Sequence, residues 1–224
     1  MSLISHWPRT PGGFGFFFGE NTMNRVAIFI DGFNLYHALD ANPAYYKYKW
    51  LNLAKFAKCF IYPKDTISEI FYFTSYVTWN PGKLAKHQIY VKALQLVGVK
   101  PIFGAFRMKD TVCRICHKAY QIPEEKQTDV NIATKLFQTA TQDIWDTAII
   151  ISGDSDLIPA IEAVKNTFPT KKVGVVIPIG RRAEELKLVT DFHRKVKPKH
   201  LQTCQFNDII KIDDTVLQRP ASWK

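Results

Sequence analysis

Residues 25–31, with the sequence Arg-Val-Ala-Ile-Phe-Ile-Asp, decide the fold. Five successive apolar residues lead directly into Asp31, and Gly32 follows. A strand that is covered by helices on both faces needs such a continuous apolar run, whereas a half-exposed strand alternates apolar and polar residues. Residues 147–151 repeat the arrangement and lead into Ser152-Gly153-Asp154. The two runs therefore predict central strands of a parallel sheet.

Short β-rich runs alternate with helical stretches along the rest of the chain, which is typical of an α/β fold with a mostly parallel sheet of five to six strands. The predicted strands are 25–30, 67–74, 99–103, 147–151 and 172–177, with a short sixth at 201–204. The spacing of apolar residues predicts helices over 83–97, over 129–140 with Thr128 as N-cap, after Asp156, and over 181–194.

The composition is that of one globular domain. The chain has 224 residues, of which 46% are hydrophobic and 22% charged. We expect a disordered, Pro- and Gly-containing extension over 1–22, a folded domain over 23–206 and a tail over 207–224. The net charge of +10 favours a polyanionic partner. No apolar stretch approaches the ~18 residues of a membrane-spanning helix, so we expect no membrane partner.

The four cysteines predict a protein of the reducing cytoplasm, because no secretory signal accompanies them. Cys113 and Cys116 have the spacing of half a zinc knuckle, but a zinc ion would need ligands from elsewhere in the chain or from a second chain. With His117 they also match the spelling of a haem attachment site. The simplest expectation for this stretch is a β-hairpin with free thiols.

Four aspartates are placed to converge. Asp31, Asp154 and Asp156 follow predicted strands, whose carboxyl ends meet at one edge of a parallel sheet, and Asp129 opens a predicted helix. Carboxylates this close repel one another unless a cation compensates them. Oxygen ligands without clustered imidazoles favour Mg²⁺ or Mn²⁺ over Zn²⁺. The alternative is that each aspartate is only a helix cap or turn former.

Four segments resemble, in this order, the NYN domain family: residues 26–36, 125–130, 151–157 and 172–175. The resemblance extends over about residues 24–205 and is to the LabA-like branch of these PIN-like nucleases. It implies a PIN-like three-layer α/β/α sandwich and metal-dependent ribonuclease chemistry. The corresponding acidic positions are Asp31, Asp129, Asp154 and Asp156, and the supporting polar positions are Asn34 and Ser152. The chain departs from the family at Gln127-Thr128, where Gly-Val often precedes the helix aspartate.

The resemblance implies a division of roles. Asp31 and Asp154 would bind Mg²⁺ or Mn²⁺ directly, and Asp129 and Asp156 would hold it through water or hold a second ion. The ion would neutralise the scissile phosphate and activate the attacking water. Asn34 would orient Asp31 or a phosphate oxygen.

Basic residues are candidates for binding RNA or single-stranded DNA. Arg181 and Arg182 follow a predicted strand, and residues 193–200 hold four fixed cations and no acid. A solvated face explains the 193–200 run equally well. Trp79 is a candidate for stacking an unpaired base, although such loop aromatics more often pack on their own domain.

Other functions stay open. A haloacid-dehalogenase-type phosphatase would need a second carboxylate two residues after Asp31, and Phe33 at that position counts strongly against this class. A non-catalytic RNA-binding or regulatory module on the same fold is the main alternative to the nuclease. The family also makes a homodimer a possible assembly.

Overall fold

A six-stranded parallel sheet forms the centre of the computed structural model, which describes residues 23–212 and 214–223. Its strand order is β3-β2-β1-β6-β7-β8. The strands are β1 (Arg25–Asp31), β2 (Thr66–Thr74), β3 (Lys100–Phe103), β6 (Thr147–Ile151), β7 (Lys172–Ile177) and β8 (Phe192–Lys195). Strands β1 and β6 pair directly, with Ile30 opposite Ile151. The two apolar runs are therefore adjacent central strands, as the sequence predicts.

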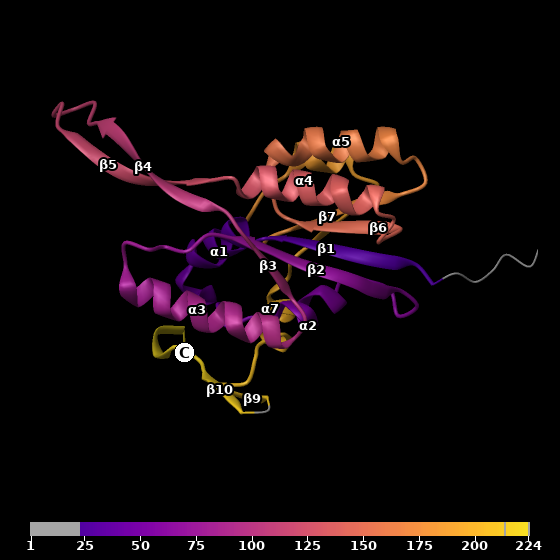
Figure 1. Cartoon of the computed structure of the whole chain (residues 1–224), viewed down its shortest axis with the longest axis horizontal. Helices are drawn as coiled ribbons and strands as arrows, with labels where there is room; N and C mark the ends of the chain where they lie inside the picture. The colour runs from indigo at the N-terminus through magenta and orange to yellow at the C-terminus, as the bar shows by residue number, and fades with distance from the viewer. Residues whose placement is uncertain (1–22, 213, 224) are drawn as a thin grey trace, which may run out of the picture.

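Helices cover both faces of this sheet (Figure 1). Alternate residues of β1 enter two separate cores, with Ile28 and Ile30 in one and Ala27 and Phe29 in the other. The first core is closed by α1 (Gly32–Asp40), the 3-10 helix η1 (Pro43–Tyr48), α2 (Leu53–Lys58), α3 (Pro81–Leu96) and α7 (Pro198–Thr203). The second is closed by α4 (Thr128–Thr141), η2 (Ser155–Leu157), α5 (Ile158–Thr167) and α6 (Glu184–Val189). The predicted three-layer α/β/α sandwich is confirmed.

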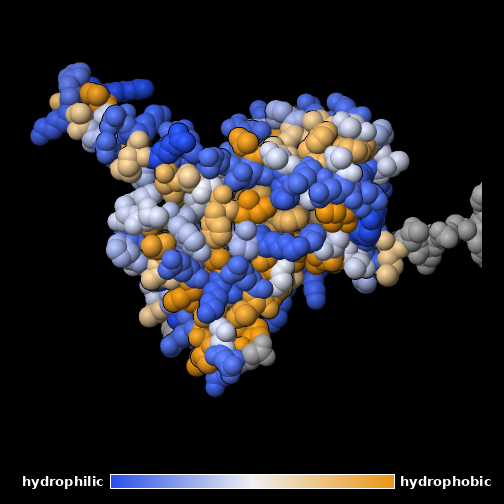
Figure 2. Space-filling model, in the orientation of Figure 1, coloured by the Kyte–Doolittle hydropathy of each residue, from blue (hydrophilic) through white to orange (hydrophobic). Residues whose placement is uncertain are grey.

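Two antiparallel hairpins are added to the sandwich. The longer one, β4 (Ala105–Val112) with β5 (Ala119–Lys126), projects from the body as an arm (Figure 1). Hydrophobic side chains, among them the exposed Met108 and Ile115, lie between hydrophilic ones along it (Figure 2). The predicted hairpin around Cys113 and Cys116 is thus confirmed, and neither cysteine forms a disulfide with a described residue.

The shorter hairpin joins β9 (Ile209–Ile212) to β10 (Thr215–Gln218) and precedes the 3-10 helix η3 (Ala221–Trp223). The Trp223 ring packs against Trp50 and Tyr90 of the main domain. The extension predicted over 1–22 lies outside the described residues, and the predicted domain boundaries stay predictions. Among the described residues, no helix is both long and apolar enough to cross a membrane.

Two predictions near the end of the sheet were wrong. Residues 201–204 do not form the sixth strand, because the chain enters α7 at Pro198, whose ring favours the first turn of a helix, and buries Leu201. The sixth strand is β8, which overlaps the end of the helix predicted over 181–194, and only α6 forms in the rest of that stretch. Asp191 explains this change, because its carboxylate accepts a 2.7 Å hydrogen bond from Val173 N and ties the segment to β7.

The start of α4 also differs from the prediction. Thr128 is the first helical residue rather than the N-cap, and Gln127 caps the helix in a left-handed conformation, with φ of 77°. The carboxylate of Glu125 accepts the free Thr128 N–H at 3.2 Å instead. A helix over α1 was not predicted either, although Asp31 caps it by accepting from Asn34 N.

Candidate metal centre

Three aspartates meet at the carboxyl edge of the sheet. Asp31 ends β1, Asp154 follows β6, and Asp129 lies in the first turn of α4. One carboxylate oxygen of each lies within 4.8 Å of those of the other two. The β1–β6 pairing brings the first two together, and packing of α4 over the sheet adds the third. Within the described residues this is the one group of three or more potential metal-ligating side chains.

Hydrogen bonds fix the Asp31 carboxylate from both sides. Ser152 Oγ donates to Asp31 Oδ2 at 2.8 Å, and Asn34 N donates to Asp31 Oδ1 at 2.9 Å. Ser152 Oγ in turn accepts from Asp154 N at 3.1 Å, which links two of the three aspartates. Both Asp31 and Ser152 are buried, so their orientations are set by the fold.

Asn34 contacts two parts of the site, Asp31 through its backbone and the turn after β6 through its side chain. Its side-chain Oδ1 accepts from Gly153 N at 3.1 Å, so the side chain holds the turn after β6, and its backbone N–H holds Asp31. A single residue of α1 therefore joins the end of β1, which carries Asp31, to the turn that carries Asp154.

Asp156 stands apart from the group of three. Its side chain is exposed, and its backbone N–H donates to Asp154 Oδ1 at 3.0 Å. Its charge still reaches the group, because it contributes to the raised pKa of Asp129. Asp156 thus lies at the rim of the cluster.

Glu125 is a further carboxylate near the cluster, and sequence reasoning missed it. It lies near the end of β5, and its Oε1 accepts from Thr128 N, Thr128 Oγ1 and, at 3.4 Å, Ser75 Oγ. Its charge contributes to the raised pKa of both Asp31 and Asp129. In the sequence, Glu125 is only an acidic residue shortly before a predicted helix, and that position alone assigns it no role.

The cluster carries negative charge that the described side chains do not compensate. Burial first, and then the charges of Asp154 and Asp31, raise the pKa of Asp129 to about 6. Burial also raises the pKa of Asp31, although its hydrogen bonds from Asn34 and Ser152 act in the opposite direction. Hard carboxylate oxygens and accumulated negative charge are the donor set of a divalent cation such as Mg²⁺ or Mn²⁺. The residues present therefore fit a divalent ion.

Basic residues lie beside the cluster. Arg181 and Arg182 are exposed after β7 and adjoin Gly153, where an added Cβ would lie 3.4 Å from Arg181 Cβ. In the 193–200 run, by contrast, the Arg194 guanidinium lies 5.1 Å over the Tyr62 ring. Trp79 packs edge-on against Phe106 at 4.8 Å, although 45% of it stays exposed. Arg181 and Arg182 are therefore the cations best placed to meet a ligand at the cluster.

A cavity of about 590 Å³ opens next to the cluster, between α1, α3 and the root of the arm. Gly32, which directly follows Asp31, lines it, as does Glu125. Gly32 is needed there, because a Cβ would lie 2.5 Å from Phe73 O and 2.7 Å from the Tyr72 ring. A molecule in this cavity would thus lie close to the aspartates.

Comparisons with known proteins agree with this architecture. The sequence model of the NYN domain matches residues 25–196, which include the whole central sheet and all three aspartates. The chain is 25% identical over 241 residues to 6-hydroxy-3-succinoylpyridine 3-monooxygenase HspA of Pseudomonas putida, in a match covering 89% of this chain and 75% of that protein. A crystal structure of a Vibrio parahaemolyticus protein of unknown function has a similar fold, with a TM-score of 0.54 and 18% identity over 80% of this chain and 96% of that one. The chain belongs to the NYN domain family, a family of PIN-like nucleases.

Proposed function

We propose that this protein is a metal-dependent ribonuclease of the LabA-like branch that hydrolyses phosphodiester bonds within RNA. The observation that carries the proposal is the convergence of Asp31, Asp129 and Asp154 at the carboxyl edge of the sheet. A net charge of +10 and the position of Arg181 and Arg182 beside the cluster support a polyanionic substrate.

Each residue of the site has a definable task in this proposal. Asp31, Asp129 and Asp154 hold Mg²⁺ or Mn²⁺, Ser152 and the Asn34 backbone fix the Asp31 oxygens, and the Asp156 backbone fixes Asp154. A bound ion supplies charge neutralisation at the phosphate and activation of water for in-line attack. Arg181 and Arg182 bind phosphate oxygens at the rim. Cleavage of single-stranded DNA and formation of a homodimer are separate predictions, which this proposal does not require.

The test is cleavage of end-labelled single-stranded RNA and matching DNA in Mg²⁺, in Mn²⁺ and in EDTA. Asp31→Asn and Asp154→Asn should abolish metal-dependent cleavage while the proteins stay folded. Asp110→Asn is the matched control, since Asp110 is exposed on the arm and its hydrogen bond from Gln121 tolerates the change. Equal cleavage by all variants would assign the activity to a contaminant. Binding of RNA without cleavage by the wild type would favour the non-catalytic RNA-binding module.

A second candidate is chemistry on a small aromatic molecule. The curated relative is named for a reaction on a hydroxylated pyridine, and the cavity of about 590 Å³ beside the cluster favours a substrate of that size. The test is incubation with 6-hydroxy-3-succinoylpyridine, O₂ and a reduced nicotinamide, followed by mass spectrometry. Consumption of the substrate that requires O₂ and the reductant, with a product whose pyridine ring carries a new oxygen atom in place of the succinoyl group, would support this candidate, and an unchanged substrate would contradict it.

A further inference from the structure

The cavity beside the acidic cluster has the composition of a ligand site. Most of its wall is apolar, and the aromatic residues that line it are Phe33, Tyr36, Tyr72, Tyr90, Phe106 and Trp223. Its volume of about 590 Å³ lies within the range of small-molecule sites, roughly 300–1,000 Å³. Flat aromatic walls favour a planar ring over a flexible chain, because stacked and edge-on contacts add to the burial of apolar area.

The cations of the cavity are not equivalent. Lys49 is already engaged, because its Nζ pairs with Asp40 and lies 4.8 Å from the Tyr36 ring centre. Lys83 and Lys86, one turn apart on α3, form no ion pair with any carboxylate among the described residues. Among the residues that the structure describes, Lys86 Nζ donates only to Ser222 Oγ, at 3.2 Å. Two lysines at one wall are therefore available to an anionic group.

Neutral polar groups line the same cavity deeper in the fold. Burial lowers the pKa of His87 to about 4, so the ring is uncharged at pH 7, and its Nε2 shares a 3.2 Å hydrogen bond with Thr74 Oγ1. Ser75 is fully buried and has one long hydrogen bond, to Glu125. Such groups suit the ring nitrogens and oxygens of a heterocycle, because each of them both donates and accepts.

We propose that this cavity binds a planar heteroaromatic ring with a negatively charged substituent, the ring between the aromatic walls and the charge at Lys83 and Lys86. A nucleotide and a free heteroaromatic acid share this chemistry. The proposal does not depend on nuclease activity, and it places the ring beside Gly32, next in sequence to Asp31.

The test is equilibrium binding to the full chain in EDTA, by calorimetry and tryptophan fluorescence. The probes are UMP and pyridine-3-carboxylate, each with its uncharged counterpart, uridine and pyridine-3-carboxamide. The charged member of a pair should bind about tenfold more tightly, because it gains a charge-assisted contact. Binding of UMP alone identifies a nucleotide subsite, and binding of the pyridine acid alone identifies a small-acid site.

Variants separate the cavity from the rest of the surface. Lys83→Ala with Lys86→Ala should remove the preference for the charged probe, and Val77→Trp, which fills the cavity, should weaken binding of both members of a pair. Lys92→Ala, exposed on the same helix and outside the cavity, should change nothing. Absence of binding by either charged probe at about 10 mM, or affinities that none of these variants alters, would overturn the proposal. Because the binding assays contain EDTA and no RNA, their outcome does not depend on whether the protein cleaves RNA.

Discussion

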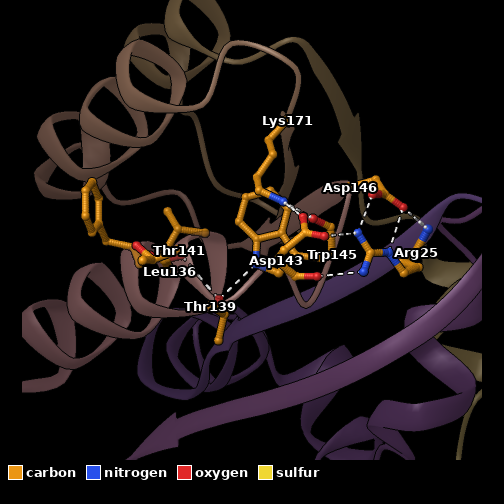
Figure 3. Close-up of polar contacts among 9 residues, drawn as sticks. Arg25, Leu136, Thr139, Thr141, Asp143, Trp145, Asp146 and Lys171 are labelled. Atoms are coloured by element: carbon orange, nitrogen blue, oxygen red, sulfur yellow. Dashed lines mark hydrogen bonds and ion pairs between the residues drawn. The ribbon is translucent and has the colours of Figure 1, made fainter.

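The Thr139 hydroxyl is buried near the C-terminal end of α4 (Figure 3). It accepts a 2.8 Å hydrogen bond from Trp145 Nε1 and lies 2.8 Å from Lys135 O, to which it donates. Trp145 is fully buried, so water cannot replace the hydroxyl as its partner. One oxygen therefore satisfies the polar atom of one of the largest side chains in the core.

Thr139→Val should lower the free energy of unfolding by about 1–3 kcal/mol, because the substitution keeps the shape and leaves the buried indole N–H unpaired. Urea denaturation measures the change. Thr141→Val is the control: its hydroxyl donates to Phe137 O at an exposed position, so its loss is replaced by water. Equal losses in the two variants would contradict this assignment.

Arg25 forms ion pairs with Asp146 and Asp143 (Figure 3). The hydrogen bond from Arg25 lowers the pKa of Asp146, and those from Lys171 and then Arg25 lower the pKa of Asp143. A carboxylate with a lowered folded-state pKa stabilises the fold above its ordinary pKa, near 3.8, and loses that contribution as the pH falls through the folded value. These pairs thus stabilise the protein at neutral pH and not in acid.

Arg25→Gln should therefore melt below the wild type at pH 7, and the two melting temperatures should converge as the pH falls toward about 2. Thermal unfolding followed by circular dichroism at several pH values measures the difference. Asp31 and Asp129 have raised pKa values, so they destabilise the metal-free fold at neutral pH. Both proteins carry these two residues, so this effect cancels in the difference between their melting temperatures. A gap that stays constant with pH would mean that Arg25 acts through packing alone.

Site residues could be predicted only where the chain itself places them at strand or helix ends. Asp31, Asp129 and Asp154 all occupy such positions. Glu125 reaches the cluster because the arm returns its second strand to the edge of the sheet, and this return is a tertiary event without a local pattern. The same holds for the cavity, whose walls come from α1, α3, the arm and η3.

Contact between β7 and β8 depends on one glycine. A Cβ at Gly174 would lie 2.2 Å from the Cε2 and Cζ atoms of Phe192, which follows directly from their pairing across the two strands. Gly174→Ala should cost about 1–3 kcal/mol of unfolding free energy, because the ring must leave its place. Adding Phe192→Leu should recover part of that loss in the same denaturation assay. If the losses of unfolding free energy from the two substitutions simply added, the Phe192 ring would not be what opposes a side chain at position 174.

The sequence predicted the bounds of buried strands and helices better than those of exposed ones. Strands β6 and β7 match their predicted bounds, since both faces of each strand are covered and the apolar run is continuous. Strand β8 contains Phe-His-Arg-Lys and alternates half-buried and exposed residues, so its pairing with β7, rather than its composition, makes it a strand. Helix α1 begins at Gly32, a poor helix former that the close approach to β2 requires.

The charge of the whole molecule should appear in the salt dependence of RNA binding. With single-stranded RNA in EDTA, the logarithm of the binding constant should fall linearly with the logarithm of the salt concentration. Arg181→Ala and Arg182→Ala should each reduce the slope by about 0.7, the value for one phosphate contact on a single strand. Fluorescence anisotropy measures the slope, with Lys92→Ala as the control. Unchanged slopes would place the phosphate backbone elsewhere on the surface.

The hydrogen bond from Ser152 to Asp31 joins residues 121 positions apart. At roughly 5–20 residues per second, a ribosome needs on the order of ten seconds to make that intervening chain. During this interval β1 lacks β6 on one side, and an apolar strand with an open edge readily recruits another strand. The acidic cluster is thus completed only after β6 has been made, and we expect folding of each copy to require that this edge stays covered until then.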